Sequence, residues 1–196
     1  MSKSARTRMY IVAQAANLFN QKGYAGTSMD DILQATGLSK GGVYGNFKSK
    51  EDIALAAFDH AVETVAREIR QRTKAHPHVL DKLCAIVEFY HQRVLSPPVE
   101  GGCPIQNTAV EADDSNPALR QRVQHALAEW QQGIMYVLER GRAAGDIQPE
   151  TDTEAFAIRF IATLQGAILL TRLYRDLRYF DAVRAQLFQM IDEISM

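Results

Sequence analysis

Residues 38–50 read LSKGGVYGNFKSK, and this stretch decides how the chain around it is interpreted. It is long enough for one short helix, yet it combines three glycines with three lysines: Gly41, Gly42, Gly45, Lys40, Lys48 and Lys50. Each glycine inside a helix costs about 1 kcal/mol relative to alanine. Glycine also lets a backbone approach a ligand closely, and the lysines indicate that this ligand is anionic.

The residues before this stretch have the pattern of two further helices. Apolar residues recur at helical spacing over residues 4–22, and this pattern stops before a glycine. Thr27 and Ser28 then provide an N-cap for a second helix, which ends at Gly37. Ser39 caps a third helix only two residues later. A tight turn with a glycine between two helices is the spacing of a helix-turn-helix.

The rest of the chain also has helical periodicity. We expect further helices over residues 50–73, 78–95, 105–112, 117–142, 151–176 and 179–194. The fifth of these is predicted to open with a capping box made by Thr151 and Glu154. The sequence therefore predicts an all-α protein of about nine helices, with a three-helix domain over residues 1–49 and a larger helical domain over 50–196.

Charge is divided unevenly between these two parts. Residues 1–50 hold seven lysines and arginines against two aspartates, and the remainder holds 15 basic against 21 acidic residues. The formal net charge of the whole chain is only −1. A basic end on an acidic body is expected when one end of a protein meets a polyanion such as nucleic acid.

The composition disfavours several classes of protein. The first ten residues lack the apolar run of a secretory signal, and FIATLQGAILL is short and interrupted by Gln165, so we do not expect it to span a membrane. Cys84 and Cys103 are too few for a disulfide framework. No two histidines have the i, i+4 spacing of a helical metal-ligand pair. We therefore expect a cytoplasmic protein without a metal or cofactor.

Two longer stretches around the turn carry a family resemblance: IVAQAANLFNQKGYAGTS over residues 11–28 and MDDILQATGLSKGGVYGNFKSKEDI over 29–53. They resemble the signature of the TetR family of bacterial transcriptional regulators, and the match is strong over residues 9–55. The segment RAAGDIQPETDTEAFA, residues 142–157, is similar to carboxyl-terminal halves in the same family. The resemblance implies an amino-terminal domain that binds double-stranded operator DNA and a larger domain that binds a small-molecule effector and forms a homodimer.

The residues expected to meet DNA lie in and before the helix-turn-helix. A recognition helix enters the major groove, which is about 12 Å wide, and glycines near its amino end permit close approach. The resemblance implies phosphate contacts from residues such as Tyr44, base contacts from Lys40 and Gly41, and contacts to the flanking backbone from the later lysines. The predicted DNA-binding set is Thr27, Ser28, Ser39, Lys40, Gly41, Gly42, Tyr44, Asn46, Lys48 and Lys50. Asn46 stands where the family more often has histidine or tyrosine. The alternative is that the lysines only solvate a surface.

A homodimer is expected because one three-helix domain contacts few bases. Two copies related by a two-fold axis read two half-sites, which squares the preference for the specific DNA sequence over other sequences. The last two predicted helices present apolar residues at helical spacing, and the resemblance implies that they form a four-helix bundle across the dimer. The predicted interface residues are Thr163, Gly166, Ala167, Leu170, Leu173, Leu187, Phe188 and Ile191. The alternative is that these residues form the core of the monomer.

The middle helices are expected to hold the effector cavity, because they mix apolar side chains with a few polar groups. The predicted effector-binding residues are Phe89, Tyr90, Cys103, Gln106, Asn107, Trp130, Ile134, Tyr136 and Gln165. Ordinary core packing is the alternative for each of them. Cys103 in GGCP precedes a proline at an expected helix start, where the helix dipole would lower the pKa of its thiol. The alternative for Cys103 is a small buried residue that fills space.

The leading hypothesis is a TetR-like regulator, expected to be a repressor that leaves its operator when the effector binds. A second hypothesis is a redox- or electrophile-sensing regulator that acts through Cys103. A third is an all-α ligand carrier or enzyme. The sequence offers no nucleophile-base pair or metal constellation for catalysis, so an enzyme is not expected.

Overall fold

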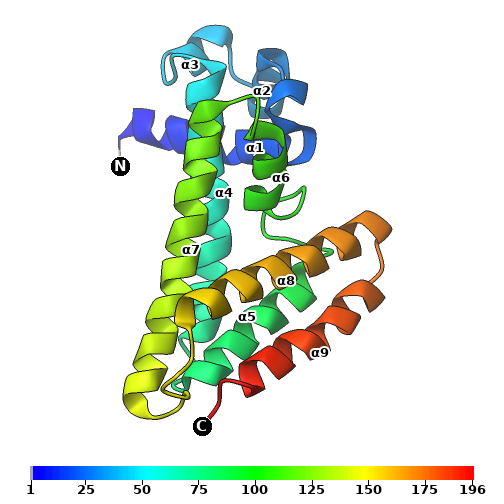
Figure 1. The fold of residues 1–196 in the computed structure, drawn as a ribbon. Helices are drawn as coiled ribbons and strands as arrows, with labels where there is room; N and C mark the ends of the chain where they lie inside the picture. Colours follow the sequence, from blue (N-terminus) through cyan, green and yellow to red (C-terminus); the bar gives the residue numbers. More distant parts are fainter. Residues whose placement is uncertain (1) are drawn as a thin grey trace. The chain divides into compact units, whose positions relative to one another are not determined.

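The computed structural model describes residues 2–196, and over this range its regular elements are helices, apart from an isolated antiparallel bridge between Ile147 and Ser195 (Figure 1). In chain order they are α1 (Lys3–Gly26), α2 (Met29–Thr36), α3 (Lys40–Tyr44), α4 (Lys50–Thr73), α5 (Val79–Arg93), α6 (Pro104–Ala112), α7 (Pro117–Ala144), α8 (Thr153–Tyr174) and α9 (Arg178–Asp192). The predicted all-α class and the expected number of helices are confirmed.

Most helix ends lie within two residues of their predicted positions, and α4 (Lys50–Thr73) has the predicted bounds. The start of α8 was predicted wrongly. Its N-cap is Asp152, whose carboxylate accepts the backbone N–H of Ala155, so Thr151 does not open the helix. α1 continues past its predicted end across a break at Gly23, where the backbone leaves the helical conformation.

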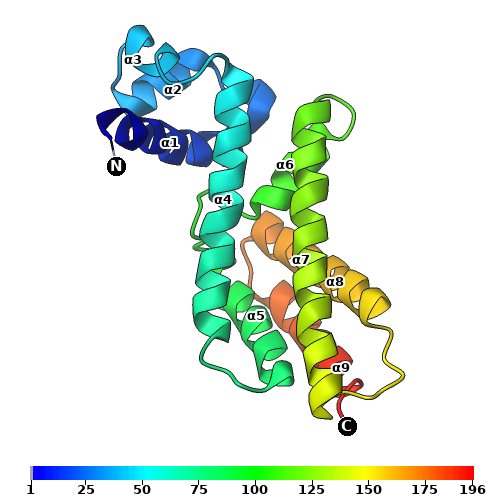
Figure 2. The same cartoon turned by 90° about the vertical axis from the view of Figure 1, so that its left-hand side faces the viewer.

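The chain forms two compact units, each assembled from two stretches. Unit 1 comprises Met1–Val65 and Pro97–Ala126, and unit 2 comprises Ala66–Ser96 and Leu127–Met196. The long helices α4 and α7, cyan and green to yellow in Figure 2, each contribute residues to both units. This division differs from the predicted boundary after residue 49, because α6 and the start of α7 belong to the same unit as the amino-terminal helices.

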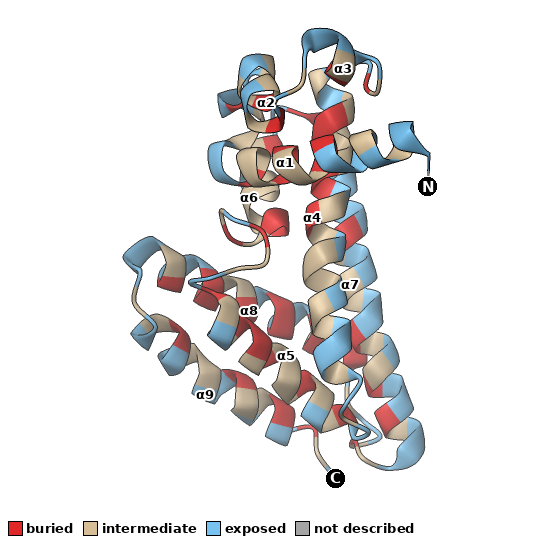
Figure 3. Ribbon diagram, turned by 180° about the vertical axis from the view of Figure 1, so that it is seen from behind, coloured by how far each residue is buried: buried red, intermediate tan, exposed pale blue. Residues whose placement is uncertain are grey.

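The core of unit 1 fixes the orientation of the short helix α3. Ile11 and Ala15 of α1, Ile32 of α2 and Val43 of α3 are fully buried, and Phe47 joins the same cluster. Figure 3 colours the buried positions of α1, α2 and α3 red. Val43 and Phe47 therefore belong to the small core beneath the three helices. Because these two side chains point inward, the opposite face of α3 is left toward solvent.

In unit 2, α9 packs against both α8 and α5. Phe156 and Phe160 of α8 are buried and stacked, with ring centroids 5.8 Å apart, and Phe180 and Leu187 of α9 are also buried. Burial of aromatic and branched side chains is the main source of stability for such helix packing. This core holds α5, α8 and α9 together as one layer of unit 2.

α8 contains the apolar run FIATLQGAILL, residues 160–170, and extends beyond it at both ends. Its 22 residues have a mean hydropathy of 1.4 in their most apolar window, so by length and composition alone the helix could cross a membrane. In this structure 44% of that window is buried, and α8 packs on α9. The core of unit 2 therefore accounts for part of its apolar character, and the rest of the window is not buried within the protomer.

Candidate nucleic-acid interface

The second helix begins with a complete capping box. The hydroxyl of Ser28 accepts the backbone N–H of Asp31 at 3.0 Å, and the Asp31 carboxylate accepts the backbone N–H of Ser28 at 2.8 Å. Lys22 lies 2.7 Å from the same carboxylate. The hydrogen bond from Lys22, followed by those from Ser28, holds the pKa of Asp31 well below its usual range. The start of α2 is thus fixed by charge-assisted contacts.

The turn between α2 and α3 is built from two local signals. Gly37 has a φ of 66°, a left-handed conformation that suits glycine, and its N–H donates to the carbonyl of Leu33 at 2.9 Å. Ser39 then caps α3, because its hydroxyl accepts the N–H of Gly42 at 3.2 Å. Together they form a helix-turn-helix, and we call α1, α2 and α3 the reading head.

One face of α3 is open to solvent. Lys40, Gly41 and Tyr44 are exposed, with about half of the Tyr44 side chain accessible, whereas Val43 and Phe47 lie in the core beneath them. The arrangement presents a cation, a bare backbone position and a hydroxyl on the same side of a short helix. Such a surface is suited to a phosphate backbone and to base edges.

The three glycines around α3 occupy different surroundings. A Cβ added at Gly41 would meet no atom within 4 Å. At Gly42 it would make ordinary contacts with Leu38 and Ser39, and at Gly45 it would lie 3.0 Å from the carbonyl oxygen of Gly41. The fold therefore gives a packing reason for glycine at Gly45, but none at Gly41.

The carboxyl end of α3 is held by the beginning of α1. The Arg8 guanidinium donates to the carbonyl of Asn46 at 2.5 Å and lies 3.9 Å from the centroid of the Phe47 ring. The Asn46 amide donates to the carbonyl of Gly42 at 2.9 Å and accepts from the Ser4 hydroxyl at 3.3 Å. Asn46 was predicted to contact DNA, but its side chain is engaged in closing α3. Arg8 was not predicted, because its partners are 38 and 39 residues away in the sequence.

Two residues of the predicted DNA-binding set instead make contacts within the protein. Thr27 is fully buried, and its hydroxyl donates to the carbonyl of Gly23 at 2.7 Å. The Lys50 ammonium donates to the carbonyls of Tyr24 at 2.8 Å and Thr27 at 3.0 Å, and it lies 4.1 Å from the centroid of the Tyr24 ring. These positions correct the prediction for Thr27 and Lys50, since the Thr27 side chain is buried and the Lys50 ammonium is bonded to backbone carbonyls of the same chain.

The other predicted residues remain available at the surface of the reading head. Ser28 and Ser39 are exposed and also make their capping bonds, and Lys48 is exposed between α3 and α4. The candidate DNA-facing set consists of Ser28, Ser39, Lys40, Gly41, Gly42, Tyr44 and Lys48.

The residues predicted for a dimer interface divide by burial. Ala167, Leu187 and Ile191 are buried within unit 2, so they belong to the protomer core and offer no surface to a partner. Leu170 and Leu173 are exposed. Thr163, Gly166 and Phe188 are half-buried. Further exposed apolar residues on α8 were not predicted: Ile158, Leu169 and Tyr174. Helical periodicity locates two apolar faces on such a helix but does not tell which one the protomer uses.

Six of the predicted effector residues lie in unit 2. Phe89, Tyr90 and Ile134 are buried, and the ring centroids of Tyr90 and Trp130 are 6.1 Å apart. Gln165 is half-buried on α8. Tyr136 is 65% exposed, which corrects its assignment to an enclosed cavity.

The other three predicted effector residues lie in unit 1: Cys103, Gln106 and Asn107. The Asn107 amide donates to the carbonyl and the side-chain oxygen of Asn20, both at 3.0 Å, and so takes part in packing α6 on α1. Cys103 is the half-buried N-cap of α6, and Pro104 follows at the first helical position, as the sequence predicted.

A groove of about 350 Å³ on unit 2 is lined by residues outside the predicted effector set: Arg72, His76, Asp81, Cys84, Ala85 and Glu88. Burial, and then the negative charges of Asp81, Asp192 and Glu88, raise the pKa of the Cys84 thiol. Cys84 is therefore mostly a neutral thiol near pH 7, and its reactivity as a nucleophile is low.

Comparison with known proteins identifies the class to which this architecture belongs. Two protein-family models match the sequence. The one described as bacterial regulatory proteins, tetR family, matches residues 11–57, and the one described as tetracyclin repressor-like, C-terminal domain, matches residues 79–187. An HTH-type transcriptional regulator of Mycobacterium tuberculosis, Rv0196, is 33% identical over 94% of this chain and 93% of its own. The chain therefore belongs to the TetR family of bacterial transcriptional regulators, and the resemblance seen in the sequence is confirmed.

Solved structures agree with this assignment. A TetR transcriptional regulator from Chloroflexus aurantiacus is 42% identical, has a TM-score of 0.94 and covers 100% of this chain and 98% of its own. The TetR family regulator CifR, solved as a cysteine mutant complexed with a 26-bp double-strand operator DNA, shares the fold with a TM-score of 0.81. It is 21% identical, and the match covers 92% of this chain and 94% of the CifR chain. Repression and release by an effector are typical of the family.

Proposed function

We propose that the protein is a repressor that binds operator DNA as a homodimer and leaves it when a small molecule occupies the larger part of the chain. The observation that carries this proposal is the open face of α3, where Lys40, Gly41 and Tyr44 stand above the buried Val43 and Phe47. Family membership gives this face its use, because TetR-family regulators bind operator DNA. A regulator of this kind acts in the cytoplasm, where bacterial DNA lies.

In the proposed complex, α3 enters the major groove and α2 crosses the backbone beside it. Lys40 and Gly41 meet base edges, Tyr44 and Lys48 meet phosphates, and Ser28 contributes from the start of α2. The bare backbone at Gly41 allows the helix to approach the bases more closely than a side chain would permit.

The proposed dimer forms through the exposed apolar residues of α8, with Leu170, Leu173 and Tyr174 as its centre. Burial of these side chains against a second copy would remove a contiguous apolar surface from water. The two reading heads would then meet half-sites about 34–36 Å apart, one turn of DNA.

The proposed effector site lies among the aromatic residues of unit 2, Phe89, Tyr90 and Trp130. Effector binding shifts these helices, and α4, which contributes residues to both units, transmits the shift so that the heads lose the spacing required by DNA. By linkage, operator DNA weakens effector binding by the same factor.

A salt-dependent binding titration tests this function. The protein is titrated against DNA from upstream of its own gene, against an unrelated duplex, and as a variant with Lys40→Ala and Tyr44→Ala. We expect binding to the specific duplex at least about a thousandfold tighter than to unrelated DNA, and a loss of that difference in the variant. Equal binding to all duplexes, including those selected from a random pool, would overturn the proposal.

A further inference from the structure

We propose that Glu111 of α6 and Lys50 of α4 are positioning residues for the reading head, which they orient by holding residues 23–27 from two sides. The inference rests on the proposed function, since it concerns how that head is presented to DNA. Residues 23–27 join the long part of α1 to Ser28, the N-cap of α2. Neither Glu111 nor Lys50 faces DNA in the proposed complex.

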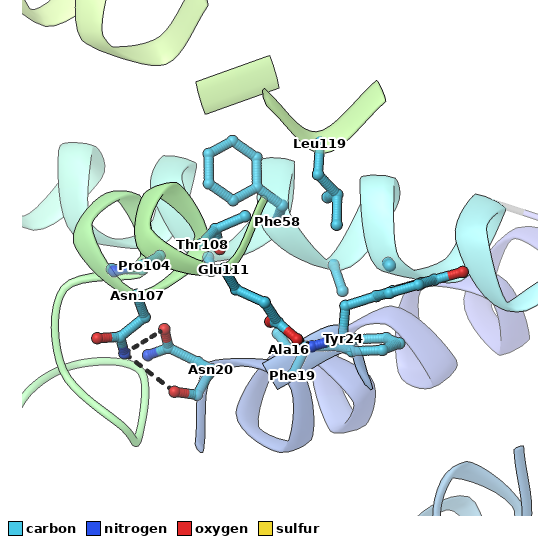
Figure 4. Close-up of a pocket in the computed structure, with 13 residues that line it drawn as sticks. Ala16, Phe19, Asn20, Tyr24, Phe58, Pro104, Asn107, Thr108, Glu111 and Leu119 are labelled. Atoms are coloured by element: carbon cyan, nitrogen blue, oxygen red, sulfur yellow. Dashed lines mark hydrogen bonds between the residues drawn. The ribbon is translucent and has the colours of Figure 1, made fainter. Parts of the chain in front are cut away.

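The backbone at Gly23 creates the need for the first contact. Gly23 has φ 75° and ψ 173°, so the helix is interrupted there and restarts with Tyr24. The first N–H groups of a helical segment have no carbonyl partner within it. The Glu111 carboxylate accepts both of the first two, from Tyr24 at 2.6 Å and from Ala25 at 2.7 Å. Figure 4 shows Glu111 reaching across to Tyr24.

The fit between Glu111 and the break is close. A Cβ placed on Gly23 would lie 2.6 Å from the Glu111 carboxylate oxygen Oε2, and the positive φ would strain any other residue. Beside this contact, the Asn107 amide donates to the carbonyl and side-chain oxygens of Asn20, as the dashed lines in Figure 4 mark. α6 therefore holds α1 on both sides of the break.

Lys50 satisfies the carbonyls of the same segment. Its ammonium donates to the carbonyls of Tyr24 and Thr27, and the Tyr24 ring lies beneath it. Within residues 23–27, a carboxylate thus accepts two amides and an ammonium donates to two carbonyls. Hydrogen bonds to ionised groups are about twice as strong as neutral ones, so the pair defines the path of the backbone that leads into α2.

The small cavity beside this segment does not offer another explanation for Glu111. It has a volume of about 30 Å³, and Glu111 itself lines it together with Asn20, Asn107 and mostly apolar side chains of α1, α4, α6 and α7. This volume suits about one water molecule and is too small for an effector. The geometry therefore assigns Glu111 to the backbone of residues 23–27.

The experiment compares Glu111→Gln with Asp114→Asn, which removes the same charge from an exposed residue close to Glu111 in the chain. Each variant and the wild type are titrated against the duplex that the wild type selects from a random pool and against an unrelated duplex. If only charge matters, both variants bind all DNA slightly more tightly, because a negative charge has been removed from a protein that meets a polyanion. If Glu111 positions the head, Glu111→Gln binds the selected duplex about tenfold more weakly, with unrelated DNA unchanged, and Asp114→Asn does not.

Amide hydrogen exchange measured by NMR separates positioning from general destabilisation. In Glu111→Gln we expect faster exchange at Tyr24 and Ala25, with unchanged exchange at the core amides of Ile32 and Ile53. Lys50→Met provides a second variant if Glu111→Gln does not fold, and the same loss of specificity is expected of it.

Operator binding by Glu111→Gln as tight as that of the wild type, or unchanged exchange at Tyr24 and Ala25, would overturn the inference. A wild type that selects no duplex would instead overturn the proposed function. In that case the exchange rates at Tyr24 and Ala25 still decide whether Glu111 holds the segment.

Discussion

Gly41 is a residue whose identity is not required by packing within the protein. A Cβ there would meet no neighbouring atom, whereas a Cβ at Gly45 would press against the carbonyl of Gly41. Alanine is a better helix former than glycine, so the fold alone would favour alanine at Gly41. The glycine is explained if the backbone at this position must come close to something outside the chain.

Gly41→Ala is therefore expected to separate stability from binding. We expect the free energy of unfolding to rise by about 0.5–1 kcal/mol, while operator affinity falls because the new methyl group meets the bases. Chemical denaturation and a DNA titration measure the two effects. Gly133→Ala on α7, which also has open space for a Cβ, is the control and should gain stability with unchanged DNA binding. Unchanged operator affinity in Gly41→Ala would remove Gly41 from the interface.

Lys48 and Lys50 are two residues apart but are expected to respond differently to substitution. Lys48 is exposed, whereas Lys50 is bonded to backbone carbonyls. Lys48→Ala should reduce the slope of log affinity against log salt by about 0.9, the value for one lost phosphate contact. Lys50→Met should weaken operator binding with the slope unchanged. The slopes come from titrations at several salt concentrations, and a reduced slope in Lys50→Met would return Lys50 to the DNA interface.

At the scale of single elements, the start of α2 gives a prediction about pH. The pKa of Asp31 is depressed in the folded protein, first by the Lys22 hydrogen bond and then by Ser28. Its contribution to stability is therefore complete above the unfolded value near 3.8 and is lost as pH falls toward the lower folded value. We expect Asp31→Ala to lower the melting temperature at pH 7, with a difference from the wild type that shrinks below about pH 4.

Asp30→Ala is the control for that experiment. It removes a carboxylate from the same first turn of α2 but leaves the capping box intact. We expect Asp30→Ala to lower the melting temperature at pH 7 by less than Asp31→Ala does, because it removes only a favourable interaction with the helix dipole. If both variants lose the same stability at every pH, the capping box is not the source of the effect.

The elements themselves were largely predictable, because their signals are local. The cap at Ser39, the turn at Gly37 and the bounds of α4 each depend on residues within a few positions of one another. The roles of Arg8 and Lys50 were not predictable in this way, since their partners lie 38–39 and 23–26 residues away. A sequence shows that a lysine is charged, but not whether its partner is a phosphate or a carbonyl of the same chain.

At the scale of the whole molecule, the exposed part of α8 gives a prediction about assembly. Leu173 is 70% exposed and Leu170 and Tyr174 are exposed near it. Leu173→Glu would place a charge in the proposed interface, and we expect monomers and weaker operator binding, as measured by sedimentation velocity and titration. Val110→Glu is the matched control, because Val110 on α6 is 80% exposed, and it should leave the oligomeric state unchanged. Dimers that persist in Leu173→Glu would place the interface elsewhere.

Unit 1 contains Pro97–Ala126 as well as the first 65 residues, and this has a consequence for synthesis on the ribosome. Chains emerge amino end first, so the residues of α3 leave the ribosome well before Glu111 does. A nascent chain that has just completed α4 carries all the residues of the proposed DNA-facing surface, but Glu111, whose carboxylate accepts the amides of Tyr24 and Ala25, has not yet been made. The order of translation therefore delays the finished reading head until α6 has been made, although the residues proposed to meet DNA are made before it.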